Sequence, residues 1–276
     1  MRLRIEDIDS PRVKPGAAEL ILDDLHWLGL DWDGEAIVQS HRLERYERAL
    51  QRLRDNELVY PCTCSRSDIT EAASAPHAGQ EGPAYPGTCA HRSAADAENL
   101  GDRSYAWRFR VTDSPAFVDG YRGPIRIPVD SLGGDFVVWK SAGTPAYQLA
   151  VVVDDADMAI TEVIRGDDLI PSTPRQLLLY EALGFAPPQY VHVPLVVGPD
   201  GRRLAKRHGD TRLASLRAAG VRPEALTGLL AWSCGWLDLP EAVLAHDLIP
   251  RFRLESVPPQ PWVLTPELLR QIGYAA

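Results

Sequence analysis

Apolar side chains recur at helical spacing in two stretches near the beginning of the sequence. Pro15-Gly16 introduces the first helix and Gly29 is placed to end it, while the second runs from about Ser40, a natural N-cap, to Arg54. Because each stripe lies on one face of its helix, we expect both stripes to pack into the core. The two stripes consist of Ala17, Ile21, Leu25 and Leu28, and of Leu43, Tyr46, Leu50 and Leu53.

The middle of the chain changes character at Tyr60. Residues 60–95 hold three of the four cysteines and a stretch rich in Gly, Pro, Ala and Ser, which indicates an insertion with little regular core. Short apolar segments separated by turn signals then predict three strands. These strands are Tyr105–Val111, Gly123–Val129 and Phe136–Trp139.

The next segment has the alternation of an α/β fold. Leu149–Val153 is an unbroken apolar run, which favours a strand buried on both faces of a parallel sheet. Glu162–Ile164 and Tyr190–Val197 are predicted strands, and a helix capped by Thr173-Pro174 runs to Leu183 between them. A strand, a helix and a strand in this order predict a right-handed crossover. A further helix is predicted over Pro223–Leu237, followed by an irregular, Pro-rich tail over Ile249–Trp262.

Composition narrows the class of protein. The chain has 276 residues, of which 45% are hydrophobic and 24% charged, which fits about two globular domains rather than a disordered chain. It has no run of about 18 apolar residues, and its charged start lacks the apolar segment of a signal peptide. We therefore expect a cytoplasmic protein whose cysteines are reduced thiols or metal ligands. The net charge of −9 argues against non-specific coating of nucleic acid.

A group of cysteines is the first candidate for chemistry. Cys62, Cys64 and Cys89 offer three of the four ligands of a tetrahedral zinc ion. On ligand chemistry alone a histidine is the preferred fourth ligand, and the alternative is three unrelated reduced thiols. The candidates for the fourth position are His77, Tyr85 and His91.

A glycine-bounded basic loop, 201–209, follows the last predicted strand. Its positive charges suit a polyphosphate, although a solvated basic turn would show the same composition. The cations of the loop are Arg202, Arg203, Lys206 and Arg207.

Arg165 stands at the carboxyl end of a predicted strand, where open α/β sheets bind ligands. Its guanidinium can hold a carboxylate through two hydrogen bonds, and Tyr147, which precedes another predicted strand, can donate its hydroxyl. The alternative is a surface ion pair of Arg165 with Asp167 or Asp168.

The first residues of the chain are also charged. Glu6 and Asp7 belong either to a solvated terminus or to a strand end that faces a cation such as an α-ammonium group. Composition does not choose between these two interpretations.

Five segments occur together in an order that is specific. They are RIEDIDSPRVKPGAAELILDDLHWLGLDWD (4–33), YPCTCSR (60–66), YPGTC (85–89), AYQLAVVVDDADMAITEVIRGDDLIPSTPRQLLLYEALG (146–184) and RRLAKRHGD (202–210). With them the chain resembles the catalytic region of the glutamyl-tRNA synthetase family, which belongs to class I. The resemblance implies an α/β fold with a Rossmann-like parallel sheet, a zinc-containing insertion and a C-terminal helical stem-contact region. The implied parts are 1–59 and 145–200 for the catalytic domain, 60–144 for the insertion, and 201–276 for the signature loop and helical region.

Within this family the chain is most similar to the short paralogues that glutamylate queuosine in tRNA(Asp). The chain ends soon after the helices that follow the signature loop, so we expect no anticodon-binding domain. The Cys-x-Cys and Tyr-x-x-x-Cys spacing and the stretch Arg251–Leu264 also match these paralogues. The resemblance implies a monomeric ligase that uses ATP with Mg²⁺, L-glutamate and queuosine-containing tRNA(Asp), with one structural Zn²⁺ per chain. Two rival hypotheses are a glutamyl-tRNA synthetase fragment that charges a tRNA 3′ end and a non-catalytic, zinc-stabilised tRNA-binding protein.

Site residues follow from the resemblance position by position. Glu6 would meet the ammonium group of glutamate, while Tyr147 and Arg165 would line its carboxylates. Lys206 would act on the ATP phosphates as the catalytic residue of a KMSKS-like loop, although Ala205 stands where the family usually has Ser. That loop is Leu204, Ala205, Lys206 and Arg207; the zinc ligands are Cys62, Cys64, Tyr85 and Cys89; and the cations expected to contact tRNA are Arg202, Arg203, Arg207, His208, Arg66 and Arg92.

In the family a first strand and the HIGH signature precede the RIED segment, and the sequence from Met1 has no counterpart of them. If Met1 is the true start, we expect poor folding and no activation of glutamate, because two neighbouring strands would lose their partner. A start assigned too far downstream is the other expectation.

Overall fold

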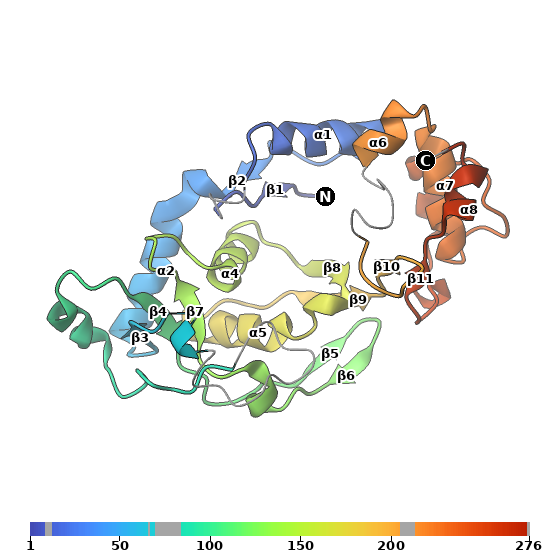
Figure 1. The fold of residues 1–276 in the computed structure, drawn as a ribbon. Coiled ribbons are helices and arrows are strands. Elements are labelled where there is room, and N and C mark those ends of the chain that lie inside the picture. The colour runs from blue at the N-terminus through green and yellow to red at the C-terminus, as the bar shows by residue number, and fades with distance from the viewer. Residues whose placement is uncertain (9–12, 66, 70–83, 205–212, 275–276) are drawn as a thin grey trace.

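A computed structural model describes residues 1–8, 13–65, 67–69, 84–204 and 213–274 (Figure 1). Its α-helices are α1 (Ala17–Trp27), α2 (Leu43–Asp55), α4 (Tyr147–Asp157), α5 (Ser172–Leu183), α6 (Leu213–Ala218), α7 (Pro223–Ser233) and α8 (Pro266–Gln271). Its strands are β1 (Arg4–Ile5), β2 (Ile37–Val38), β3 (Val59–Cys62), β4 (Ala106–Phe109), β5 (Phe117–Asp119), β6 (Gly123–Ile125), β7 (Phe136–Trp139), β8 (Glu162–Gly166), β9 (Gln189–Val193), β10 (Val196–Val197) and β11 (Trp262–Val263). None of the described helices is both long and apolar enough to cross a membrane.

The strands form a mixed set of small sheets. Three pairs are parallel, namely β1–β2, β8–β9 and β10–β11, while β3–β4–β7 and the hairpin β5–β6 are antiparallel. The parallel pairing of β8 with β9 around α5 confirms the predicted strand–helix–strand unit. The expectation of one parallel sheet is corrected, because β1–β2 and β8–β9 are separate sheets in the described part of the chain.

The predicted strand Leu149–Val153 is wrong, because these residues lie inside α4. All eight residues from Gln148 to Asp155 are buried, so this helix is covered on every side. A short apolar run reads the same in a buried helix as in a buried strand. Tyr147 is therefore the first residue of a helix rather than the residue before a strand.

Three other local predictions also change. Gln39–Arg42 forms a 3₁₀ turn before α2, and Ser40 caps no helix but donates its N–H (2.8 Å) and hydroxyl (2.6 Å) to the carboxylate of Asp7. Thr173 lies inside α5, whose N-cap is Pro171. The strand predicted over Tyr190–Val197 is interrupted between β9 and β10.

The first apolar stripe forms a helix, α1, but is not core. No residue of α1 is buried, and Ile21 is 59% exposed. At the end of the helix, Trp27 and the following residue Leu28 pack against the C-terminal hydrophobic cluster. In the second stripe Leu43 is exposed, whereas the other members are buried as predicted. Those members are Tyr46, Leu50 and Leu53.

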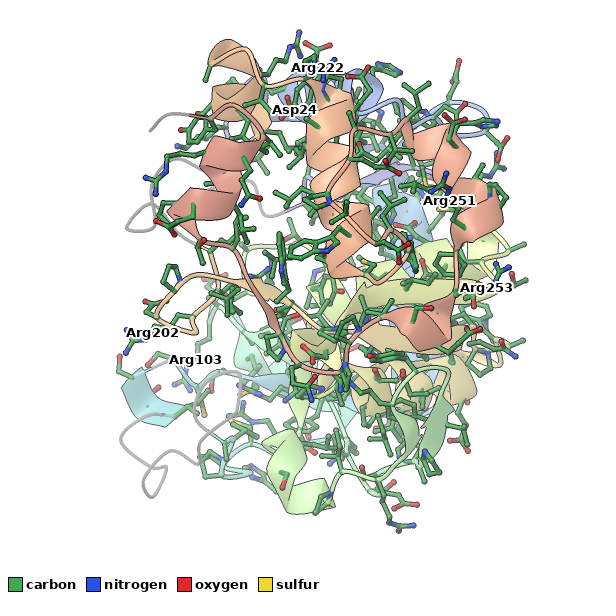
Figure 2. All side chains as sticks on the ribbon, turned by 90° about the vertical axis from the view of Figure 1, so that its right-hand side faces the viewer. Asp24, Arg103, Arg202, Arg222, Arg251 and Arg253 are labelled. Atoms are coloured by element: carbon green, nitrogen blue, oxygen red, sulfur yellow. The ribbon has the colours of Figure 1, made fainter. Side chains whose placement is uncertain are left out.

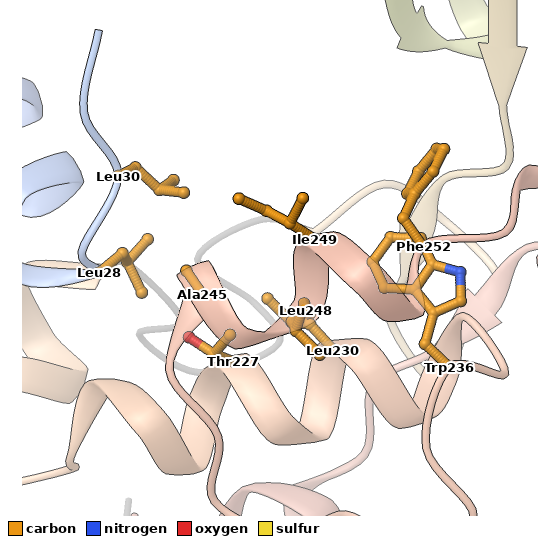
Figure 3. A pocket seen from close by; sticks show the side chains of 9 residues that line it. All are labelled: Leu28, Leu30, Thr227, Leu230, Trp236, Ala245, Leu248, Ile249 and Phe252. Carbon is orange, nitrogen blue, oxygen red and sulfur yellow. The ribbon is translucent and has the colours of Figure 1, made fainter.

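The main core lies where α2, α4 and α5 pack against the β3–β4–β7 sheet. In Figure 1, α4 and α5 lie between that sheet and the C-terminal helices α7 and α8. A second cluster forms around α6, α7 and α8. Beside it, an apolar pocket of about 510 Å³ opens between the end of α1, α7 and the 3₁₀ segment Ala245–Arg251 (Figure 3). Its lining residues are Leu28, Leu30, Thr227, Leu230, Trp236, Ala245, Leu248, Ile249 and Phe252.

A buried carboxylate joins the N-terminal segment to α4. Asp154 is fully buried and accepts hydrogen bonds from Gln39 Nε2 and Arg42 Nε, both at 2.8 Å, and from the Tyr46 hydroxyl at 2.9 Å. A charge can remain in such a place only when several donors surround it. Asp154 therefore fixes α2 and the turn before it against α4.

This network predicts that substitutions of two aspartates of α4 lower the free energy of unfolding by very different amounts. Asp154→Asn removes the charge that Arg42 needs, so we expect the free energy of unfolding to fall by about 3 kcal/mol or more. Asp157→Asn is the matched control, because Asp157 also pairs with Arg42 but its side chain is 32% exposed, and exposed pairs contribute about 1 kcal/mol or less. Urea denaturation followed by circular dichroism measures both; equal losses would contradict the assignment.

Candidate functional site

Arg165, on β8, is held by a shell of buried polar groups. Its Nε donates to Nε2 of His192 at 2.9 Å, and its Nη atoms donate to Gln176 Oε1 at 2.9 Å and Thr173 Oγ1 at 2.8 Å. The guanidinium also lies over the ring of Tyr190, 4.9 Å from its centroid. The half-buried guanidinium is thereby fixed in one orientation, although all of these partners are neutral.

The alternative ion pair for Arg165 is wrong. Asp167 accepts from Arg122 Nη2 at 2.7 Å, and Asp168 pairs with Arg203 at 3.1 Å. No carboxylate within the described residues pairs with Arg165, so its positive charge is available to an anionic ligand.

Glu6 and Arg4 form a second charged element beside α4. The carboxylate of Glu6, which follows β1, accepts from Nε and Nη2 of Arg4 at 3.2 and 3.0 Å. Arg4 in turn donates to Asp155 of α4 at 2.5 Å. The position of Glu6 is thus set by an arginine that a largely buried carboxylate holds in place.

Tyr147 lies between these two charged elements. Partial burial raises the pKa of its hydroxyl, the positive charge of Arg165 opposes that rise, and the charge of Glu6 adds to it. Both charges act on one phenol because the structure brings Glu6, Tyr147 and Arg165 into one neighbourhood. The residue as a whole remains 41% exposed.

A buried amide group lies in the same place. Oε1 of Gln176 accepts from Arg165 at 2.9 Å and from the Tyr190 hydroxyl at 3.3 Å. Its Nε2 faces the hydroxyl of Tyr147 and lowers the pKa of that phenol. Cationic, hydroxyl and amide donors near a carboxylate together suit a ligand that carries both carboxylate and ammonium groups.

The groups behind Arg165, namely His192, Gln176 and Asp119, were not predicted from the sequence. Asp119 accepts from Nδ1 of His192 at 2.6 Å. The only sequence signal for His192 is a polar residue inside the apolar stretch YVHVPL, which by itself does not distinguish a core histidine from a functional one.

Most of the predicted KMSKS-like loop lies outside the described residues, including Ala205, Lys206, Arg207 and also His208. The loop leaves the described structure at Leu204, just after a bridge between Val197 and Arg203. The Arg203–Asp168 pair places the start of this loop beside the end of the strand that carries Arg165.

Three cysteines between residues 62 and 89 converge. The Sγ atoms of Cys62, Cys64 and Cys89 all lie within 4.8 Å of one another, and those of Cys64 and Cys89 are 3.7 Å apart. Zinc with Zn–S bonds of about 2.3 Å places neighbouring sulfurs about 3.8 Å apart. The residues present therefore fit a tetrahedral metal ion.

Tyr85 lies closer to the cysteine group than His91 does. Its hydroxyl lies 3.4 Å from Cys62 Sγ and accepts the N–H of Cys89 at 2.8 Å. Its ring is covered by the guanidinium of Arg108, 3.8 Å from the centroid. His91 is exposed and does not belong to the group, and His77 lies outside the described residues.

The thiols are not equivalent in their protonation. Burial and the hydrogen bond with Cys89 raise the pKa of Cys64 to about 11. Burial would also raise the pKa of Cys89, but hydrogen bonds from the backbone of Thr63 and from the side chains of Cys64 and Tyr85 outweigh it and lower the pKa to about 7. A bound cation would favour the thiolate form throughout.

Residues 1–270 match the family model of the class I tRNA synthetases (E and Q), catalytic domain. The chain therefore belongs to this family of aminoacyl-tRNA synthetase-type ligases.

Two relatives and one solved structure are similar to most of this chain. The Glutamyl-Q tRNA(Asp) synthetase of Rhodopirellula baltica is 47% identical over 274 residues, covering 95% of this chain and 83% of the relative. That of Symbiobacterium thermophilum is 49% identical, covering 94% and 84%. Among solved structures, a glutamate tRNA ligase from Elizabethkingia meningosepticum in complex with its amino acid matches with a TM-score of 0.81 at 26% identity. That match covers 98% of this chain and 61% of the longer ligase, so the class I tRNA synthetase fold is shown.

The thiol geometry predicts about one zinc ion per chain in purified protein. Cys64→Ala removes one of the clustered sulfurs, so we expect loss of stoichiometric zinc by metal analysis. Cys234→Ala is the matched control, because Cys234 follows α7 outside the group and its loss should leave zinc unchanged. Zinc retained by the Cys64 variant at the wild-type level would contradict the site.

The fourth ligand is tested in the same protein by competition with a chelator. Tyr85→Phe should release zinc at a lower chelator concentration than the wild type, whereas His91→Ala should not. The reverse order would assign the fourth position to His91.

Proposed function

We propose that this chain activates L-glutamate with ATP and transfers the glutamyl group to queuosine in the anticodon loop of tRNA(Asp). The observation that carries the proposal is the cluster of Glu6, Tyr147 and Arg165, found in a chain whose relatives of 44–49% identity include several Glutamyl-Q tRNA(Asp) synthetases. In this proposal Glu6 meets the ammonium group, and Tyr147 and Arg165 meet the carboxylates.

The first step needs no protein nucleophile. The α-carboxylate oxygen of glutamate attacks the α-phosphorus of ATP, the bond to the β-phosphate oxygen breaks, and glutamyl-adenylate and pyrophosphate form. The contribution of the chain is to position the reactants and to stabilise charge, with Lys206 on the phosphates that Mg²⁺ accompanies. In the second step a queuosine hydroxyl attacks the acyl carbon, loses its proton, and AMP leaves.

The insertion has a structural role in this proposal. A zinc ion held by Cys62, Cys64, Tyr85 and Cys89 would fix a segment whose own apolar cluster is small, consisting chiefly of these residues with Tyr60 and Ile69. Metal binding then contributes directly to the folding free energy of the insertion. The chemistry of the ligase reaction does not pass through this ion.

For tRNA the chain must present local cations against its net charge of −9. Arg202 and Arg203 are exposed before the signature loop, and Figure 2 shows Arg202 projecting from the surface there, apart from Arg251 and Arg253 of the C-terminal segment. Arg92 instead donates to the carbonyl of Pro61 and supports the cysteine loop. Arg202 and Arg203 are therefore the described cations that we propose for tRNA contact, while Arg66, Arg207 and His208 lie outside the described residues.

A glutamate–tRNA ligase activity at a tRNA 3′ end is the second candidate. It is favoured by a Glutamate–tRNA ligase of Synechococcus sp., which is 45% identical over 241 residues. That match covers 84% of this chain, against 95% for the first relative, a Glutamyl-Q tRNA(Asp) synthetase that is 47% identical. The broader match supports transfer to queuosine.

The carboxylate role of Arg165 predicts a selective loss of glutamate affinity. Arg165→Ala should weaken glutamate binding roughly tenfold or more, because it removes a charge-assisted hydrogen bond. ATP binding should change much less, since Arg165 is proposed to meet the amino acid. Calorimetric titration measures both, with Arg48→Ala, an exposed arginine that pairs with Glu44 on α2, as the control; equal losses for glutamate and ATP would refute the role.

The acceptor is tested by transfer of radiolabelled glutamate to two forms of tRNA(Asp), with and without queuosine. We expect labelling of the queuosine form alone. Labelling should persist when the 3′-terminal adenosine is removed, because the proposed acceptor lies in the anticodon loop. Labelling that requires this adenosine and ignores queuosine would establish the second candidate.

A further inference from the structure

A buried aspartate and histidine stand directly behind Arg165. Asp119 Oδ2 lies 2.6 Å from His192 Nδ1, and the side chains of both residues have no solvent exposure. On the other side of the ring, His192 Nε2 lies 2.9 Å from Nε of Arg165. The three groups form one line of hydrogen bonds from the insertion to the proposed carboxylate ligand.

The chemistry of the line fixes the tautomer of the imidazole. An arginine Nε–H can only donate, so Nε2 of His192 must accept and its ring proton must sit on Nδ1. Burial lowers the pKa of His192, and the charge of Arg165 lowers it further. Together they outweigh the hydrogen bond to Asp119, which would raise the pKa, so the ring stays neutral at pH 7. The Nδ1–H then donates to the carboxylate of Asp119.

Asp119 is itself held by the β5–β6 hairpin. The pKa of Asp119 lies below its usual range, although burial alone would raise it. Hydrogen bonds cause the decrease, and they come from the backbone N–H groups of Arg122, His192 and Tyr121 and from the His192 ring. The hairpin lies close against β9, since the N–H of Gly120 donates to the carbonyl of Tyr190 at 2.8 Å. A Cβ at Gly120 would meet Cγ2 of Val191 at 2.8 Å, so only glycine allows this approach.

We propose that Asp119 and His192 are positioning residues that set the orientation of Arg165 for the carboxylate of the amino-acid substrate. This inference rests on the proposed role of Arg165. The carboxylate selects one imidazole tautomer, and that tautomer offers the acceptor that stops the guanidinium from rotating. Through this line the hairpin of the insertion contributes to amino-acid recognition without touching the ligand.

Asp119→Asn tests the tautomer directly. The amide oxygen can still accept the backbone N–H groups, but the amide nitrogen donates to Nδ1 of His192 and moves the ring proton to Nε2. Two donors then face each other between His192 and Arg165. We expect ¹⁵N NMR to show the Nε2–H tautomer in this variant, and the Arg165 Nε–H to lose the protection from exchange that it has in the wild type.

The same variant should bind glutamate roughly tenfold more weakly. His192→Leu, which removes both ring nitrogens, should weaken glutamate binding to a similar extent. His192→Gln should restore both the Nε–H protection and the affinity to within about threefold, because its amide can donate to Asp119 and accept from Arg165 at once. A role confined to stability gives no reason for this rescue.

Val191→Ala is the control for lost packing, because Val191 is a buried neighbour on β9 whose side chain meets Gly120. It should lower the melting temperature and leave the Arg165 Nε–H protected. Equal protection of this N–H in the wild type, Asp119→Asn and His192→Leu would overturn the inference. The NMR signals can be measured without a ligand. If the wild type does not bind glutamate but the Asp119→Asn and His192→Leu variants still lose the Arg165 Nε–H protection, the proposed function is refuted and the positioning role stands.

Discussion

Charged groups at the candidate site keep their places because buried carboxylates hold them. Arg4 is bound by Asp155 of α4, and Arg165 is bound through His192 by Asp119 of the β5–β6 hairpin. An ionised group can be buried only when protein partners replace its hydration. The partners that stabilise each charge therefore also hold the side chain in one position. The arrangement of Glu6, Tyr147 and Arg165 depends on this constraint, since each stands on a different element of the chain.

These pairs also explain how distant segments form one unit. Asp154 and Asp155 bring the N-terminal strand and α2 to the middle of the chain, across more than a hundred residues of sequence. The hairpin β5–β6 does the same for the insertion, and Tyr121 and Arg122 extend it to the carbonyls of Val257 and Pro259 in the C-terminal segment. Helix α4 is buried because α2, α5 and β7 pack around it.

Local patterns predicted much of the fold. The β8–α5–β9 unit, β7 and the helices α1, α2 and α7 follow from periodicity and turn residues, and the cysteine spacing predicted a cluster that the structure brings together. The run 149–153 failed because apolar continuity does not distinguish a buried helix from a buried strand. The apolar stripe of α1 failed because periodicity shows which face is apolar and not what covers it. Asp119 and His192 lie 73 residues apart, so no spacing connects them; the resemblance supplied Glu6, Tyr147 and Arg165 but not the groups that hold them.

A crystal structure of this chain with a non-hydrolysable glutamyl-adenylate analogue tests the proposed site most directly. We expect the side-chain carboxylate of the analogue within hydrogen-bond distance of Arg165, with Tyr147 beside it, the ammonium group near Glu6, and the His192–Asp119 pair unmoved behind the guanidinium. An analogue bound elsewhere, or bound here with Arg165 turned away from it, would contradict the proposed role of these residues.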